Sequence, residues 1–265
     1  MPTATILVKM LRASLALAAV SAVAAWGAAP SYSAASIVNA GNFTPGPFAP
    51  NSLLTIFGAN LARSAQAIGE ADVRDGYLPT ELNYTQVFVD NIPAPLWYVS
   101  DGQINFLMPA KQATGPAKIR VAREGVSGGE VVVQVVDAAP ALFATADGYA
   151  VATDAKGALL TTDSPAQGGD IIVLYATGLG KTSPNTATGA LPRDAAQIVM
   201  LNDLKVIIGG VTLAASRILY AGVSPGFAGL YQINLSLPDH LDALPEIRLT
   251  IGAQSSPSGL KLPAR

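Results

Sequence analysis

Apolar and polar residues alternate with a period of two along several short segments of the chain. In residues 117–123 the apolar Ile119 and Val121 alternate with charged residues, and residues 246–251 show the same pattern. Because successive side chains of a strand point to opposite faces, this period predicts half-buried strands in antiparallel sheets. The best helical candidate, residues 61–71, is short enough to be either a helix or a loop.

The dipeptide Asp101-Gly102 separates two strand-like runs, residues 95–100 and residues 103–108. Both central residues of a type I′ turn need positive φ, which aspartate and glycine adopt more readily than most residues. The sequence therefore predicts a β-hairpin with a two-residue type I′ turn at this point.

The chain contains an internal repeat of these strand-like segments. Four pieces recur in the same order, and the offset between matched residues grows from 118 to 129 along the chain. The matched pairs are residues 53–61 with 171–180, 87–93 with 206–212, 95–98 with 217–220, and 103–109 with 232–238. A growing offset indicates one ancestral unit with insertions in the second copy, the largest of them between Tyr220 and Gln232.

Each copy spans roughly 100 residues and about seven short strands, which is typical of an immunoglobulin-like sandwich. We expect an all-β chain with two tandem sandwiches, residues 36–137 and 138–265, with the boundary near Pro140. Trp97 and Leu219 hold equivalent places in the repeat, so both are predicted to lie in a core.

The N-terminal 35 residues have the order of a secretory signal peptide. Lys9 and Arg12 precede the apolar run Ala13–Ala29, and a small-residue stretch follows. This order predicts export with cleavage after Ala35, which has Ser33 two positions before it.

Three alternatives stay open for this N-terminal segment. Cleavage after Ser33 also leaves small residues at the required positions, and translation could start at Met10 instead of Met1. An uncleaved membrane anchor is the third alternative, although a run of 17 residues dominated by alanine is short for a membrane span. A cleaved signal would leave a mature chain without a transmembrane segment, secreted or periplasmic.

Composition leaves little reactive chemistry in this chain of 265 residues. There is no cysteine, which excludes disulfides and thiolate sites, and His240 is the single histidine. Loss of residues 1–35, with two basic and no acidic residues, moves the formal charge from −2 to −4. Such a balance gives no electrostatic basis for binding nucleic acid.

The segment from Ser36 to Leu61, SIVNAGNFTPGPFAPNSLLTIFGANL, resembles a family of secreted bacterial C-terminal domains that is abundant in acidobacteria-type soil bacteria. Residues 93–109, 174–180 and 220–238 fit the same family, which covers nearly the whole mature chain. The strand ending in FGANL is also similar, more distantly, to the TIG/IPT immunoglobulin-like fold. The resemblance implies two β-sandwiches, often at the end of larger secreted proteins, and supplies no catalytic residues.

The segment Gly178-Leu-Gly180-Lys181-Thr182 follows a hydrophobic strand as a phosphate-binding loop would. A P-loop also needs a glycine where the chain has Tyr175, and a helix where it has SPNTATGALP. A glycine turn that ends a strand is therefore the preferred interpretation.

His240 and the acidic residues offer the remaining candidates for catalysis or metal binding. His240 lies between Asp239 and Asp242, but the chain has no GxSxG nucleophile elbow, so an exposed loop histidine is predicted. No calcium-loop motif occurs, although a site assembled from distant loops stays open. The acidic residues considered for such a site, or for a polysaccharide hydrolase, are Asp90, Asp101, Asp137, Asp147, Asp154, Asp163 and Asp170.

Aromatic residues could form a sugar-stacking platform, and three asparagines lie in glycosylation sequons. The aromatic candidates are Trp97, Tyr98, Tyr220, Phe227 and Tyr231, and the sequon asparagines are Asn42, Asn83 and Asn234. Trp97 and Tyr98 are adjacent in a strand and point to opposite faces, so at least one must be buried. In a chain that resembles a bacterial family the sequons are attributed to chance, and Asn234 to a structural role in its strand.

These observations favour a secreted, non-catalytic interaction or structural module of the bacterial envelope, with a protein or glycan partner. No catalytic, metal or cofactor residue is assigned, and no cofactor is expected. The alternatives are a carbohydrate-binding module and an extracellular polysaccharide hydrolase or lyase.

Overall fold

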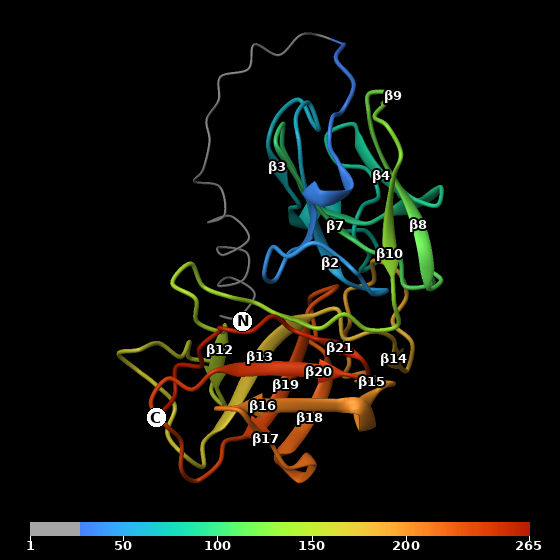
Figure 1. Ribbon diagram of the computed structural model, residues 1–265. Helices are drawn as coiled ribbons and strands as arrows, with labels where there is room; N and C mark the ends of the chain where they lie inside the picture. The colour runs from blue at the N-terminus through green and yellow to red at the C-terminus, as the bar shows by residue number, and fades with distance from the viewer. Residues whose placement is uncertain (1–26) are drawn as a thin grey trace.

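The computed structural model describes residues 27–265, and the greater part of the predicted signal peptide lies outside these residues. The described chain forms two β-sandwiches, one above the other in Figure 1, with the first in blue to green and the second in yellow to red. The 21 strands of the described residues pair with one another only in antiparallel fashion, so the predicted all-β, two-sandwich fold is confirmed.

The first sandwich contains two five-stranded sheets. One sheet has the order β1 (Ile37–Asn39), β2 (Leu53–Phe57), β7 (Gln103–Leu107), β6 (Leu96–Val99) and β3 (Gln66–Ala67). The other has the order β10 (Val131–Val135), β8 (Gly115–Arg123), β4 (Thr85–Val89) and β5 (Ile92–Ala94), and β9 (Val126–Ser127) also pairs with β8.

The second sandwich contains a seven-stranded and a four-stranded sheet. The larger sheet has the order β11 (Ala141–Leu142), β13 (Ile171–Thr177), β19 (Tyr231–Ser236), β18 (Ile218–Val223), β15 (Gln197–Ile198) and β14 (Thr182–Ser183), with β12 (Ala152–Asp154) also on β13. The smaller has the order β17 (Val211–Thr212), β16 (Leu204–Ile208), β20 (Ile247–Ile251) and β21 (Gln254–Ser255).

Helical structure in the described residues is limited to four single turns of 3₁₀ helix, η1 (Ala34–Ser36), η2 (Glu70–Asp72), η3 (Leu201–Asp203) and η4 (Ala215–Arg217). Residues 61–71 thus form a loop that carries β3 and part of η2, and not a helix. Within residues 27–265 none of these turns has the length and hydrophobicity needed to span a bilayer.

The strand pairings reproduce the repeat predicted from the sequence. Asn105 of β7 pairs with Tyr98 of β6, and its counterpart Asn234 of β19 pairs with Tyr220 of β18. The amide of the preceding glutamine donates to the asparagine Oδ1 in both copies, at 2.9 Å from Gln103 and 3.3 Å from Gln232. Asn234 therefore has the structural role that the sequence predicted.

The hairpin predicted at Asp101-Gly102 is present, but its predicted turn type is wrong. Val99 of β6 pairs with Ile104 of β7, yet neither Asp101 nor Gly102 has positive φ. Ser100 changes this turn, because its hydroxyl accepts a hydrogen bond from Gln103 N at 3.0 Å. This side-chain bond offers the backbone an alternative to the type I′ geometry.

The positive-φ pair that a type I′ turn requires occurs instead at equivalent points of the two copies. Asp90 and Asn91 connect β4 to β5 with φ of 47° and 65°, and Gly209 and Gly210 connect β16 to β17 with φ of 57° and 81°. The repeat thus extends to turn geometry, although the residue types differ.

Each sandwich has its own apolar core between its two sheets. In the first, Ile56 and Phe106 meet Val87 and Ile119 from the facing sheet. In the second, the predicted inward positions of β20, which are Ile247, Leu249 and Ile251, are buried. The period-two pattern therefore identified the core faces of these strands correctly.

Leu219 is an exception, because it is 52% exposed and not in a core. The strands β6 and β18 both have a register shift, between Leu96 and Tyr98 and between Ile218 and Tyr220. Such a bulge leaves the extra residue outside the regular pairing. Leu219 therefore faces solvent, whereas its counterpart Trp97 is covered by the second sandwich.

Candidate functional site at the junction of the two sandwiches

A third apolar cluster contains residues of both sandwiches and joins their two cores. Its buried members from the first sandwich are Ala40, Leu53, Leu78, Trp97 and Leu107, and those from the second are Phe143, Val151, Tyr175, Phe227, Ala228 and Leu230. The central contact is a stack of Trp97 on Phe227, with ring centroids 4.1 Å apart and planes inclined by 14°. Large stacked rings bury much apolar area with little loss of side-chain freedom.

Hydrogen bonds fix the orientation of the two sandwiches at this junction. Leu53 N donates to Thr177 Oγ1 at 2.9 Å, and Ala110 N donates to Thr188 Oγ1 at 3.0 Å. Both bonds join backbone of the first sandwich to hydroxyls of the second. The junction therefore combines a buried apolar centre with directional polar contacts.

The largest insertion of the second copy supplies the second sandwich's main contact at the junction. Phe227, Ala228 and Leu230 all come from this insertion. Between them Gly229 has φ of 81°, and a Cβ at this position would collide with the Leu107 side chain. The insertion thus serves to dock one copy of the repeat on the other.

Beside the junction lies a groove between the loop that follows β1 and the segment around β21. It consists of two adjacent hollows of about 240 and 210 Å³, and Asn42, Thr44 and Pro257 line both of them. The floor is the start of the second sandwich around β11, where Ala144 N donates to Gly41 O at 3.2 Å. Because both sandwiches line the groove, its shape depends on the junction.

The groove lining is neutral and contains no aromatic residue. Its hydrogen-bonding side chains are amides and hydroxyls, and prolines, glycines, alanines and leucines complete it. The polar members are Asn39, Asn42, Thr44, Gln254, Ser255, Ser256 and Ser258. Amide groups and hydroxyls both donate and accept hydrogen bonds, so this lining suits an uncharged ligand that does the same.

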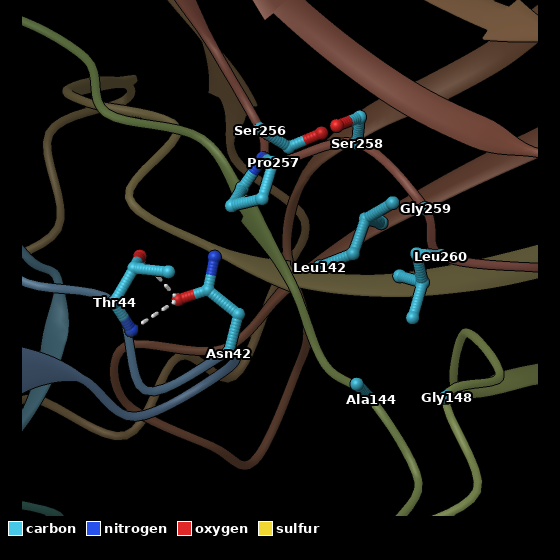
Figure 2. Close-up of a pocket in the computed structure, with 10 residues that line it drawn as sticks. All are labelled: Asn42, Thr44, Leu142, Ala144, Gly148, Ser256, Pro257, Ser258, Gly259 and Leu260. Atoms are coloured by element: carbon cyan, nitrogen blue, oxygen red, sulfur yellow. Dashed lines mark hydrogen bonds between the residues drawn. The ribbon is translucent and has the colours of Figure 1, made fainter.

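Hydrogen bonds to Thr44 hold the side-chain amide of Asn42 in one orientation. Its Oδ1 accepts hydrogen bonds from Thr44 N at 3.0 Å and from Thr44 Oγ1 at 2.7 Å. These bonds fix the amide plane, and Figure 2 shows the amide nitrogen pointing away from Thr44 toward Pro257. The Asn42 Nδ2 is thus held as a donor at the point where the two hollows meet.

The glycine loop 178–182 has the structural role that the sequence favoured. Gly178 and Gly180 have φ of 76° and 85°, and a Cβ on either would collide with the carbonyl of Ala139 or Asp137. Thr182 begins strand β14 and not a helix. The two glycines therefore allow the chain that connects the sandwiches to pass close to the end of β13.

His240 and the acidic candidates lie outside the groove. His240 is exposed, as predicted, and its neighbour Asp239 forms an ion pair with Arg217 at 3.3 Å. Six of the seven acidic candidates are exposed, and Asp154 is half-buried. Several of these carboxylates cap turns: Asp154 Oδ1 accepts from Ala158 N at 2.8 Å and Asp170 Oδ2 from Gln167 N at 2.7 Å.

The acidic candidates do not come together into a metal site within the described residues. Across residues 27–265 no three histidine, aspartate or glutamate side chains gather closely enough to hold an ion.

The aromatic platform considered from the sequence is wrong, because its members are committed to the interior. Trp97, Tyr98, Phe227 and Tyr231 are buried, and the hydroxyl of the half-buried Tyr220 donates to Val223 O at 2.9 Å. The exposed aromatic rings of the described residues are those of Phe43, Tyr77 and Tyr84.

From the sequence Asn42 stands out only as the first residue of a sequon, and the other groove residues carry no site signal of their own. Residues 254–259, QSSPSG, are a turn-rich polar run whose composition could have marked a loop. Nothing in the local sequence indicates that this loop faces Asn42, about 215 residues earlier in the chain, because that proximity results from docking of the two sandwiches.

Comparison with known protein families supports the fold of the first sandwich. Residues 41–135 match the IPT/TIG domain. The distant immunoglobulin-like similarity expected from FGANL is thus confirmed for this part of the chain. No curated protein matches the chain.

Several solved structures align with most of the chain at low similarity. A surface glycan-binding protein from Prevotella bryantii has 12% identity and a TM-score of 0.28, over 89% of this chain and 42% of that one. A γ-CGTase from alkalophilic Bacillus clarkii has 11% identity and a TM-score of 0.28, over 89% and 25%. A surface glycan-binding protein from a xyloglucan utilization locus of Bacteroides uniformis has 11% identity and a TM-score of 0.27, over 89% and 50%. The chain thus spans half or less of these proteins, and likeness at this level says nothing about its function.

Proposed function

We propose that this chain is an exported, non-catalytic binding module whose groove between the two sandwiches takes a neutral, hydroxyl-rich ligand, a glycan. The observation that carries the proposal is the groove lining, which consists of neutral residues with amide and hydroxyl groups at several points of its wall. A sugar presents the complementary set, since each hydroxyl both donates and accepts and the ring carbons are apolar.

The rigidity of the groove supports binding over a merely structural role. Thr44 fixes the Asn42 amide, and the Trp97–Phe227 stack fixes the two walls relative to each other. A preformed site loses little conformational entropy when it binds, so a few hydrogen bonds can give measurable affinity.

A polysaccharide hydrolase or lyase is the competing proposal, and the groove does not favour it. Glycoside hydrolysis generally uses two carboxylates that flank the scissile bond. The groove lining has no aspartate, glutamate or histidine, so it offers no side chain for general acid–base catalysis.

Export is supported by the order of residues in the N-terminal segment, with Lys9 and Arg12 before an apolar run and small residues after it. Fractionation of an expressing bacterium tests this part of the proposal. We expect the protein in the periplasm or medium, and retention in the cytoplasm would contradict export.

The binding proposal is tested on an array of neutral and acidic oligosaccharides, followed by calorimetry with the strongest neutral one. Asn42→Asp keeps the Oδ1 that Thr44 needs but replaces the Nδ2 donor. We expect it to weaken binding by roughly 2- to 12-fold, the worth of one hydrogen bond. Ser258→Trp should fill the groove and abolish binding.

Ser164→Trp is the matched control, since Ser164 is an exposed loop serine outside the groove. We expect it to bind like the unmodified protein. Binding that survives Ser258→Trp would place the ligand elsewhere, and preference for acidic oligosaccharides would overturn the ligand class.

A further inference from the structure

Residues 28–36 are an integral part of the first sandwich, although the sequence pattern predicts that most of them belong to the signal peptide. Ser31 and Ala59 exchange two backbone hydrogen bonds of 2.9 Å each. The Tyr32 hydroxyl donates to Gly129 O at 2.6 Å and accepts from Val121 N at 2.8 Å. Figure 1 shows this segment, in blue, running along the first sandwich.

Two glycines of the sandwich make room for this segment. A Cβ on Gly128 would lie 2.6 Å from Pro30 O, and a Cβ on Gly58 would collide with Ser31 O. Neither glycine has positive φ, so close approach of the segment is what these positions require. The sandwich is thus shaped to receive residues 30–31.

Arg123 at the end of β8 gives the strongest evidence that the N-terminal segment belongs to the folded protein. It is only 7% exposed, and its Nη2 donates to Ala28 O at 2.8 Å. Its Nε has no hydrogen-bond partner within the described residues, and no described carboxylate forms an ion pair with it. Without Ala28, a buried guanidinium would lose this acceptor, which is costly for a charged group.

Cleavage after Ala35 or Ser33 would remove all of these contacts. We propose that signal peptidase instead cleaves after Ala24, and that residues 28–36 stay on the mature protein as an N-terminal strap of the first sandwich. Water adds across the Ala24–Ala25 peptide bond, which leaves a carboxylate on Ala24 and a free amino group on Ala25.

The sequence around Ala24 fits this cleavage point. Ala22-Val-Ala24 places small residues at the last position and two before it. The apolar run from Ala13 to Val23 then has 11 residues, which lies within the 7–15 typical of a signal peptide, whereas the run to Ala29 has 17.

The proposed cleavage point rests on the proposed export. The first experiment distinguishes a wrong cleavage point from a failure of export. The full chain is expressed in an exporting bacterium, and the secreted product is analysed by intact mass and N-terminal sequencing. We expect Ala25 as the first residue. A start at Ala34 or Ser36 would overturn this inference alone, and an uncleaved cytoplasmic chain would overturn export as well.

The second experiment tests whether the strap belongs to the fold. Chains that begin at Ala25 and at Ser36 are compared by denaturant unfolding, each with Arg123 and with Arg123→Met. We expect the shorter chain to have the lower midpoint. Arg123→Met should lower the midpoint of the longer chain but leave that of the shorter chain unchanged or raised, because there the guanidinium has lost Ala28 O. Equal effects in both chains would contradict the strap.

Discussion

Trp97 of the first sandwich and Phe227 of the second form a parallel stack, with ring centroids 4.1 Å apart, at the centre of the junction. Trp97 occupies the bulge of β6, and the same bulge of the second copy holds Leu219. Trp97 is 7% exposed and Leu219 is 52% exposed. Equivalent positions of the repeat thus have opposite environments, because the second sandwich covers only one of them.

This difference predicts opposite sensitivities to truncation. Trp97→Ala should lower the free energy of unfolding by about 3–5 kcal/mol, as expected for a large buried aromatic residue. Leu219→Ala is the matched control and should change it by about 0.5 kcal/mol or less. Urea unfolding followed by circular dichroism measures both, and similar losses for the two variants would contradict the described junction.

The shared cluster also predicts that the two sandwiches unfold together. We expect one calorimetric transition for the unmodified protein, because Phe227 and its neighbours couple the two cores. Phe227→Ala should divide it into two transitions, one for each sandwich. Two separate transitions in the unmodified protein would show that the junction contributes little to the coupling between the two sandwiches.

Gly178 is predicted to tolerate substitution less well than Gly210. Both have positive φ, 76° and 81°, so alanine costs roughly 1–2 kcal/mol at either position. A Cβ on Gly178 also collides with Ala139 O, whereas nothing lies within 4 Å of one on Gly210. Gly178→Ala should therefore cost about 1–3 kcal/mol more than Gly210→Ala. Thermal unfolding of the two variants checks the order.

Alkaline solution should destabilise the fold through buried tyrosines. Burial raises the pKa of Tyr231 well above its ordinary value of 10, and it also raises the pKa values of Tyr32 and Tyr220. The folded state then retains phenolic protons that the unfolded state loses above about pH 10. Stability is therefore complete below pH 10 and decreases as the pH rises above it.

Denaturant midpoints between pH 8 and 11 measure this effect. Tyr231→Phe removes the hydroxyl that donates to Gly180 O, so it should lower stability at pH 8. It should also make the decrease above pH 10 less steep. An unchanged slope would assign the alkaline effect to other groups.

Much of the fold could be predicted from the sequence because it depends on local pattern and on repetition. Alternation identified the buried faces of β8 and β20, the dipeptide Asp101-Gly102 indicated the pairing of β6 with β7, and the matched segments indicated two copies of one unit. The type I′ turn predicted at Asp101-Gly102 is wrong, because the Ser100 hydroxyl competes locally with that geometry. The predicted exposure of an aromatic platform is wrong for a different reason. Alternation cannot show that a second sandwich covers the outer face of a sheet.

The sequence by itself determined the all-β class, the two copies of the repeat and the insertion after Tyr220. Only the tertiary structure decided what that insertion does, which positions of the repeat are exposed and which residues form the groove. The physical reason is that strand periodicity reports burial of one face against a sandwich's own core. Docking of Phe227 on Trp97, the approach of the Ser256 segment to Asn42 and the fit of Tyr32 to the first sandwich join residues far apart in the chain.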